Sequence, residues 1–179
     1  MSKISIFEKE QDRLFAACFE PNQKDELDNA LDFWRDIEQL RAFFIQNQKD
    51  LNKFATDVKV KDAVKLALDE GNTIYDNLKK FSEGDNLDEL FKPLDDRESE
   101  DTRYEYQKTK AKSGLRKGML RIYAVKFRGW YVITGGAIKL VDHMNDRPYL
   151  KTELYKLEEV RKLLQEGNTE GSFVYLDVQ

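Results

Sequence analysis

Hydrophobic and polar positions recur with two different periods along this chain, and the changes of period divide it into elements. Residues 4–10 alternate and residues 13–19 are almost continuously apolar, which predicts two strands at the start. Apolar positions then recur at steps of three and four over 24–47 and again over 59–82. This spacing predicts two long amphipathic helices, and their direct succession favours an antiparallel pair.

Strand-like patterns dominate the second half of the chain. Residues 104–112 and 120–127 alternate, and residues 130–141 are mostly apolar, which is typical of a central strand. The pair Gly135-Gly136 inside that strand indicates a bulge or a close backbone approach. A helical stripe of leucine and valine follows Pro148, and residues 173–178 have the composition of an edge strand.

These elements predict an α+β fold in which an antiparallel β-sheet packs against two long N-terminal amphipathic helices, with a further helix near the C-terminus. A chain of 179 residues can bury one complete core, so we expect a single domain over 1–179. Its expected parts are the strands of 1–20, the helical pair of 24–82, a loop-rich connection at 85–103, a basic antiparallel sheet at 104–141 and a C-terminal helix at 149–166.

The amino-acid composition limits the kinds of site and the cellular location that this chain can have. Cys18 is the only cysteine, which excludes an internal disulfide and fits a reducing cytoplasm. No apolar run approaches the roughly 20 residues of a membrane span, so we expect a cytoplasmic protein without a membrane partner. Because His143 is the only histidine and the acids show no ligand spacing, we expect neither a metal site nor a cofactor.

Charge is distributed unevenly along the chain. The net charge is −4, but residues 1–102 carry −10 whereas residues 103–162 carry +9. Within 103–128, nine basic residues stand against the single acid Glu105. A basic block inside an acidic chain indicates an anionic partner.

The basic block coincides with strand-like segments that also carry aromatic residues. Cations that contact phosphates, interleaved with rings on which bases stack, are what RNA binding requires. The candidate contacts are Lys108, Lys110, Lys112, Arg116, Lys117, Arg121, Lys126, Arg128 and Lys139, with Tyr104, Tyr106, Tyr123 and Trp130. The alternative is a solvated sheet face whose lysines protect an exposed edge.

Arg121 and Lys139 are unusual because each interrupts an otherwise apolar strand. A cation in that position is costly unless its head reaches water or a partner. Strand alternation places Arg121 and Tyr123 on the face opposite to Ile122. Beside a functional role, two alternatives stay open: the side chains snorkel to water, or they pair with carboxylates of the acidic half.

Several short motifs follow one another in the second half of the chain. They are LFKPL at 90–94, the basic strand Tyr104–Lys112, Leu120-Arg121-Ile122-Tyr123, Gly136-Ala137-Ile138-Lys139-Leu140 and the helix Thr152–Gln165. Their order resembles the RelE/ParE toxin superfamily, most closely its HigB-like branch. The resemblance covers mainly residues 90–166 and implies a RelE-like fold.

This resemblance implies a metal-independent mRNA endoribonuclease of a toxin–antitoxin system, acting on the ribosome and neutralised by a cognate antitoxin protein. In such an enzyme the RNA 2′-hydroxyl attacks the adjacent phosphodiester, lysines help to deprotonate it, and arginines stabilise the developing charge. The roles implied are phosphate stabilisation by Arg116 and Arg121, proton removal or positioning by Lys110, Lys112 or Lys139, and base stacking by Tyr106 or Tyr123.

Two other interpretations of the same residues stay open. A non-catalytic RelE-like interaction protein would bind nucleic acid or a partner protein through the basic sheet. An unrelated α+β protein would use the sheet in a metabolic or structural role.

Overall fold

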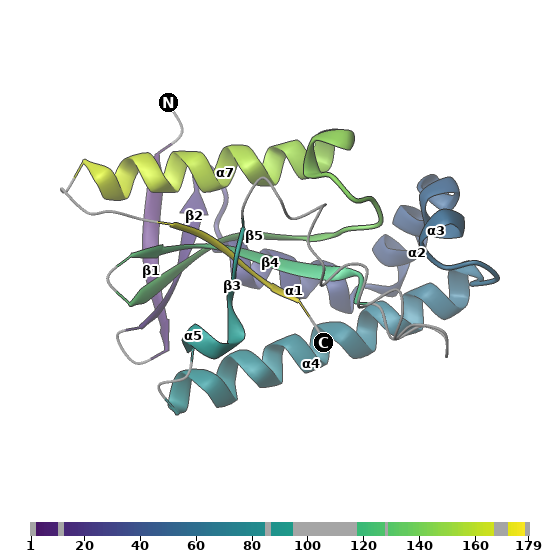
Figure 1. Ribbon diagram of the computed structural model, residues 1–179, viewed down its shortest axis with the longest axis horizontal. Helices are drawn as coiled ribbons and strands as arrows, with labels where there is room; N and C mark the ends of the chain where they lie inside the picture. The colour runs from purple at the N-terminus through teal and green to yellow at the C-terminus, as the bar shows by residue number, and fades with distance from the viewer. Residues whose placement is uncertain are drawn as a thin grey trace.

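Figure 1 shows the computed structural model of the chain, which describes residues 3–10, 13–84, 87–94, 118–127, 129–166 and 172–177. Helices occupy most of the first half, and strands lie at both ends of the chain and in its second half. In chain order the elements are β1 (Ile4–Glu10), β2 (Leu14–Phe19), α1 (Glu26–Arg35), α2 (Ile37–Gln46), α3 (Gln48–Phe54), α4 (Val60–Glu83), α5 (Leu87–Leu90), β3 (Lys92–Pro93), β4 (Leu120–Phe127), β5 (Trp130–Ile138), η3 (Met144–Asp146), α7 (Pro148–Gln165) and β6 (Ser172–Asp177).

The described strands form one mixed sheet in the order β1-β2-β5-β4-β6-β3. Most neighbours pair antiparallel, as predicted, including β4 with β5. The prediction of a wholly antiparallel sheet is wrong at one place, because β2 and β5 run parallel with Phe15 opposite Val132. The direction of a pair depends on the route of the chain between two strands, and the side-chain pattern within a strand carries no record of that route.

The helix predicted over 24–47 is divided in two, and a third short helix follows it. Asp36, which follows α1, is extended with φ −94° and ψ 104°, and its carboxylate accepts hydrogen bonds from the backbone N–H groups of Glu38 and Gln39. An aspartate in this position ends one helix and starts the next, because its side chain satisfies free N–H groups at the new N-terminus. Asn47 then separates α2 from α3. The second predicted helix is confirmed as α4, which is continuous over 24 residues.

Helices cover both faces of the sheet, with α7 on one side and α1 and α4 on the other (Figure 1). On the α1–α4 side, Trp34 and Ile74 pack in one hydrophobic core with Ile122. On the α7 side, Leu157 and Val160 pack in a second core with Tyr123 and Val125. The α+β class and the predicted alternation along β4 are therefore confirmed.

The remaining predictions for the second half have different outcomes. Strands β4 and β5 are confirmed, and α7 agrees with the helix predicted at 149–166, with Pro148 in its first turn. The strand predicted at 173–178 is confirmed as β6, but its predicted place at the edge of the sheet is wrong, because it pairs with β4 on one side and with the two-residue strand β3 on the other. The strand predicted at 104–112 lies outside the described residues.

None of the described helices is both long enough and apolar enough to cross a lipid bilayer.

Candidate functional site

Three of the predicted catalytic residues lie on one face of the β4–β5 pair. Arg121 is opposite Ala137, and Tyr123 is opposite Gly135. Alternation along β5 puts Lys139 on the same face as Ala137, which belongs to the α7-side core. The structure therefore brings Arg121, Tyr123 and Lys139 to the α7 side of the sheet, as the strand pattern predicted for the first two.

These three side chains are enclosed rather than open to solvent. Arg121 is 2% exposed, and Tyr123 and Lys139 are 0% exposed. The Nη1 atom of Arg121 donates to the carbonyl oxygens of Gly118 at 3.1 Å and of Leu120 at 3.0 Å. The expectation of a solvent-facing catalytic surface is therefore wrong for these residues, and so is the alternative that Arg121 and Lys139 snorkel to water.

Lys126 and Trp130, two predicted RNA contacts, lie at the other end of the hairpin and on opposite faces of it. Lys126 pairs with Tyr131, whereas Phe127 pairs with Trp130. The Nζ atom of Lys126 lies 2.8 Å from a carboxylate oxygen of Asp88 and 5.6 Å from the centre of the Tyr131 ring. The Tyr131 hydroxyl donates to the same carboxylate. These bonds, first that from Lys126, lower the pKa of Asp88, while burial raises the pKa of Tyr131.

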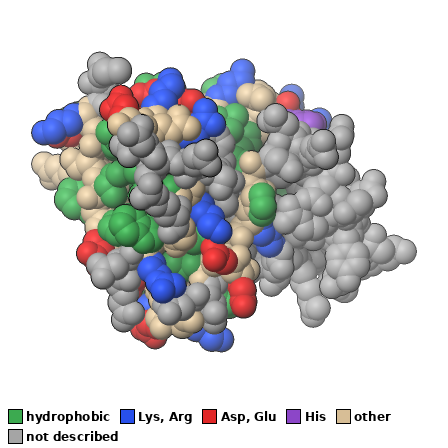
Figure 2. Space-filling model, turned by 60° about the vertical axis from the view of Figure 1, so that its left-hand side comes forward, with side chains coloured by type: hydrophobic (Ala, Val, Ile, Leu, Met, Phe, Trp, Pro, Cys, Tyr) green, Lys and Arg blue, Asp and Glu red, His purple; other side chains and the backbone are tan. Residues whose placement is uncertain are grey.

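Aromatic side chains gather around the turn between β4 and β5. The Trp130 ring centre lies 5.6 Å from that of Phe15 and 5.4 Å from that of Phe127. Trp130 is 45% exposed. Figure 2 brings forward the side of the molecule that carries β1 and this turn, and hydrophobic side chains gather there among basic and acidic ones. An exposed indole supported by two other rings offers a flat stacking surface.

The other predicted site residues lie outside the described residues. They are the predicted catalytic residues Lys110 and Arg116, and the predicted RNA contacts Tyr106, Lys108, Lys112, Lys117 and Arg128.

A buried ionic cluster joins α1 to α7, and no spacing of charged residues in the sequence predicted it. The Nζ atom of Lys156 lies 2.7 Å from Glu26 Oε2 and 3.1 Å from Glu153 Oε1. Glu26 and Glu153 are buried, and Glu153 Oε2 has no hydrogen-bond partner in the described part of the chain. Burial raises the pKa of Glu153 to about 7, partly offset by Lys156.

The ionic cluster explains why position 135 in β5, the first of two adjacent glycines, has no side chain. A Cβ atom built on Gly135 would lie 1.9 Å from Glu153 Oε2, so a larger residue requires the carboxylate to move. The Gly135-Gly136 pair was the only signal of this contact in the sequence, and its predicted close backbone approach is confirmed. The glycine pair did not indicate that α7 is the helix that approaches β5, or that Glu153 is the charged residue at the contact.

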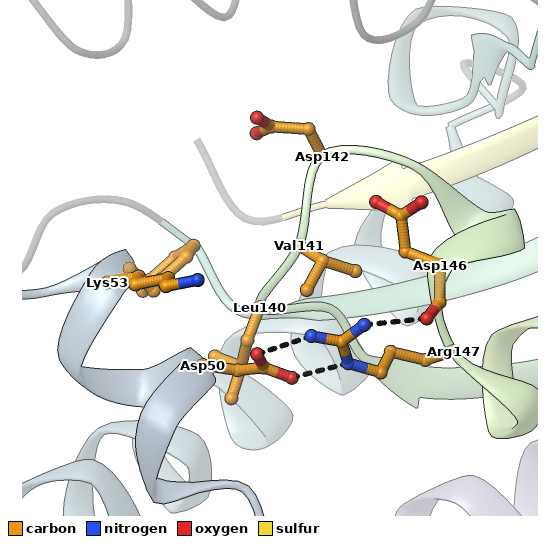
Figure 3. Close-up of a pocket in the computed structure, with 8 residues that line it drawn as sticks. Asp50, Lys53, Leu140, Val141, Asp142, Asp146 and Arg147 are labelled. Carbon is orange, nitrogen blue, oxygen red and sulfur yellow. Dashed lines mark hydrogen bonds and ion pairs between the residues drawn. The ribbon is translucent and has the colours of Figure 1, made fainter.

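A charged cavity lies next to the end of β5, between α3 and the connection that leads into α7 (Figure 3). Its volume is about 290 Å³, and an ion pair between Asp50 and Arg147 lies at its side. Within the described residues, no group of three or more histidine, cysteine, aspartate or glutamate side chains is placed to hold a metal ion.

No protein family model matches this chain, and neither the curated proteins nor the solved structures contain a significantly similar one.

Proposed function

We propose that this protein binds single-stranded RNA through its basic block, residues 103–128, and through the aromatic end of the β4–β5 hairpin. The observation that carries the proposal is the charge of the block, which has nine basic residues against one acid and includes β4. Seven of the nine remain as candidate phosphate contacts, because Arg121 is buried and Lys126 is paired with Asp88. Release of counter-ions by such cations supplies much of the affinity for RNA.

The hairpin end adds the second chemical element of RNA binding. Trp130 is 45% exposed, and Phe15 and Phe127 support its ring. Bases of a single strand stack on such rings with little preference for sequence. Because Trp130 follows the basic block within two residues, one strand of RNA can contact both.

Burial of Arg121, Tyr123 and Lys139, the three predicted catalytic residues that the structure describes, favours binding over cleavage. Stabilising a phosphorane-like transition state needs donors in direct contact with the reacting phosphate. Arg121 and Lys139 are 2% and 0% exposed, so a phosphate does not reach them in this conformation. The best-supported function is therefore that of a non-catalytic interaction protein.

A HigB-like mRNA endoribonuclease is the second candidate, and one observation favours it. Arg121, Tyr123 and Lys139 share one face of two adjacent strands, where a cation pair and a tyrosine could act on one phosphate. This candidate requires that face to become exposed. Its partners would be mRNA on the ribosome and a cognate antitoxin protein, and its place the cytoplasm.

RNA binding is tested by fluorescence anisotropy with a labelled oligouridine at several salt concentrations. Replacing Lys108, Lys110 and Lys112 by Gln should weaken binding and reduce the slope of log K against log salt by about 2, since each phosphate contact on a single strand contributes about 0.7. The matched control replaces Lys59, which precedes α4, and Lys61 and Lys65 in its first turns, all of which are exposed and carry the same charge. That control should retain the wild-type slope.

Two outcomes contradict the proposal. Equal loss of affinity in both triple variants would mean that only net charge matters, and absence of binding by the wild type would remove RNA as the partner. The RNA recovered from the mixture should be intact. Cleavage in buffer containing a metal chelator would instead support the endoribonuclease.

A further inference from the structure

The cavity beside the end of β5 has walls of opposite charge. Its lining residues are Asp50, Lys53, Phe54, Leu140, Val141, Asp142, Asp146 and Arg147. Helix α3 supplies one wall, and the segment between β5 and α7 supplies the other (Figure 3). A volume of about 290 Å³ is at the lower end of the range for small-molecule sites.

Two of the charged residues that line this cavity, Asp50 and Arg147, neutralise each other in an ion pair. The Arg147 guanidinium donates to both carboxylate oxygens of Asp50, from Nη2 at 2.6 Å and from Nε at 2.7 Å. Asp50 is 7% exposed, and the hydrogen bonds from Arg147 lower its pKa. A bidentate pair of this kind holds both side chains in place, so it forms a rigid support rather than a free charge.

The remaining charged side chains of the cavity are exposed, and they act on the Asp50–Arg147 pair only through longer-range electrostatics. Lys53 on α3, and Asp142 and Asp146 on the opposite wall, make no hydrogen bond or ion pair through their side chains within the described residues. In Figure 3 the Lys53 ammonium points toward the wall formed by Leu140 and Val141, while the Asp142 and Asp146 carboxylates lie higher in the view. The apolar groups of Phe54, Leu140 and Val141 lie among these charges.

A buried polar group near the same ion pair also lacks a partner. The Tyr149 hydroxyl is enclosed and makes no hydrogen bond among the described residues. Burial, together with the charge of Asp50, raises the pKa of Tyr149 to about 12, so its hydroxyl keeps its proton. Tyr149 does not line the cavity, so this hydroxyl is a neutral donor behind the Asp50–Arg147 pair rather than part of the ligand site.

Charge decides which class of ligand this cavity accepts. Three carboxylates and two cations give the lining one net negative charge, which disfavours nucleotides and other polyanions. A ligand with only an ammonium group would leave Lys53 unpaired, and one with only a carboxylate would leave both aspartates unpaired. A ligand that carries both groups and a small apolar group pairs with Lys53 on one wall, with the aspartates on the other, and packs against Phe54, Leu140 and Val141.

We propose that this cavity binds a free α-amino acid with an aliphatic side chain. Its carboxylate lies at Lys53, its ammonium group at Asp142 and Asp146, and its side chain against Phe54, Leu140 and Val141. This site is separate from the basic block, so the proposal holds whether or not the protein binds RNA.

Isothermal titration calorimetry of the full chain with L-leucine tests the site. The two matched probes are isoamylamine, which lacks the carboxylate, and 4-methylpentanoate, which lacks the ammonium group. We expect leucine to bind at least about tenfold more tightly than either probe, because loss of one charge-assisted contact removes about that much affinity. Tighter or equal binding of isoamylamine would overturn the proposal in favour of a simple amine site, and absence of leucine binding would overturn it altogether.

Variants locate the two ends of the ligand. Lys53→Met and the double change Asp142→Asn with Asp146→Asn should each weaken leucine binding about tenfold, and the loss should be small for the probe that lacks the corresponding group. All three residues are exposed, so the fold should be unaffected. The controls are Lys65→Met and Asp76→Asn on the exposed side of α4. Leucine affinity that is unchanged in the cavity variants, or equally reduced in the controls, would overturn the assignment.

Discussion

Glu153 is a glutamate in a buried environment, which is unusual for a residue of its type. Its side chain lies on α7 between Lys156 of the same helix, Glu26 of α1 and the backbone of Gly135. One carboxylate oxygen accepts from Lys156, and the other has no partner in the described part of the chain. Burying a carboxylate in this way favours its neutral form, which is why its pKa rises from 4.5 to about 7.

The direction of the resulting pH dependence follows from linkage. In the unfolded chain this carboxyl loses its proton near pH 4.5, whereas in the folded protein it keeps the proton until about pH 7. Its contribution to stability is therefore complete below pH 4.5 and is lost as the pH rises through 7. Above pH 7 the buried charge costs on the order of 2–3 kcal/mol.

Glu153→Gln should therefore leave stability nearly unchanged at pH 5 and increase it by about 2 kcal/mol at pH 8, because the amide reproduces the protonated carboxyl and cannot ionise. Urea unfolding at several pH values measures the difference. The control is Glu158→Gln, which makes the same substitution on the same helix at a half-exposed carboxylate that forms an ion pair with Arg161 at 2.8 Å. A constant effect of Glu153→Gln between pH 5 and pH 8 would mean that Glu153 is ionised throughout.

At the scale of elements, two adjacent glycines let helices approach β5 from both sides. A Cβ atom on Gly135 would lie 1.9 Å from Glu153 Oε2 on α7. A Cβ atom on Gly136 would lie 2.8 Å from the Cβ of Ala30 on α1 and 3.1 Å from the backbone oxygen of Arg121. The first contact is with the end of a side chain, and the second includes backbone.

This difference predicts the outcome of a double-mutant cycle. Gly135→Ala and Gly136→Ala should each destabilise the protein by about 1–3 kcal/mol through overpacking. Adding Glu153→Ala should offset much of the loss from Gly135→Ala, because it removes the atoms in the way, and should leave the loss from Gly136→Ala unchanged. Chemical denaturation of the single and double variants measures both couplings. Equal couplings at the two positions would show that Glu153 is not the group that restricts Gly135.

Local sequence pattern was sufficient for some of these elements and not for others. Alternation along 120–127 correctly separated Tyr123 from Ile122, because a strand repeats every two residues whatever surrounds it. The helix break at Asp36 lies within a continuous apolar stripe, and the capping role of an aspartate depends on backbone geometry. Burial of Lys139 and the parallel pairing of β2 with β5 depend on contacts between distant segments, which periodicity does not record.

At the scale of the whole molecule, the sheet is covered on both faces, and this limits what the face carrying Arg121 and Lys139 can do. Three apolar side chains of α7, those of Leu150, Leu157 and Val160, are completely buried. Burying each such side chain contributes roughly 1.5–3 kcal/mol, so removing α7 from the sheet costs about as much as the entire stability of a typical domain. We therefore expect α7 to leave the sheet only when the whole protein unfolds.

Native-state hydrogen exchange measures whether α7 opens separately. The slowest amides of α7 should exchange with the same free energy as those of β4 and β5, and all three should show the same steep dependence on low concentrations of denaturant. Strand β1, which pairs only with β2 among the described strands, is the internal comparison and should exchange at lower free energy. Exchange of α7 several kcal/mol below β4, with little dependence on denaturant, would reveal a local opening that uncovers Arg121 and Lys139. That result would favour the endoribonuclease over the binding protein, because catalysis on the α7 side of the sheet requires such an opening.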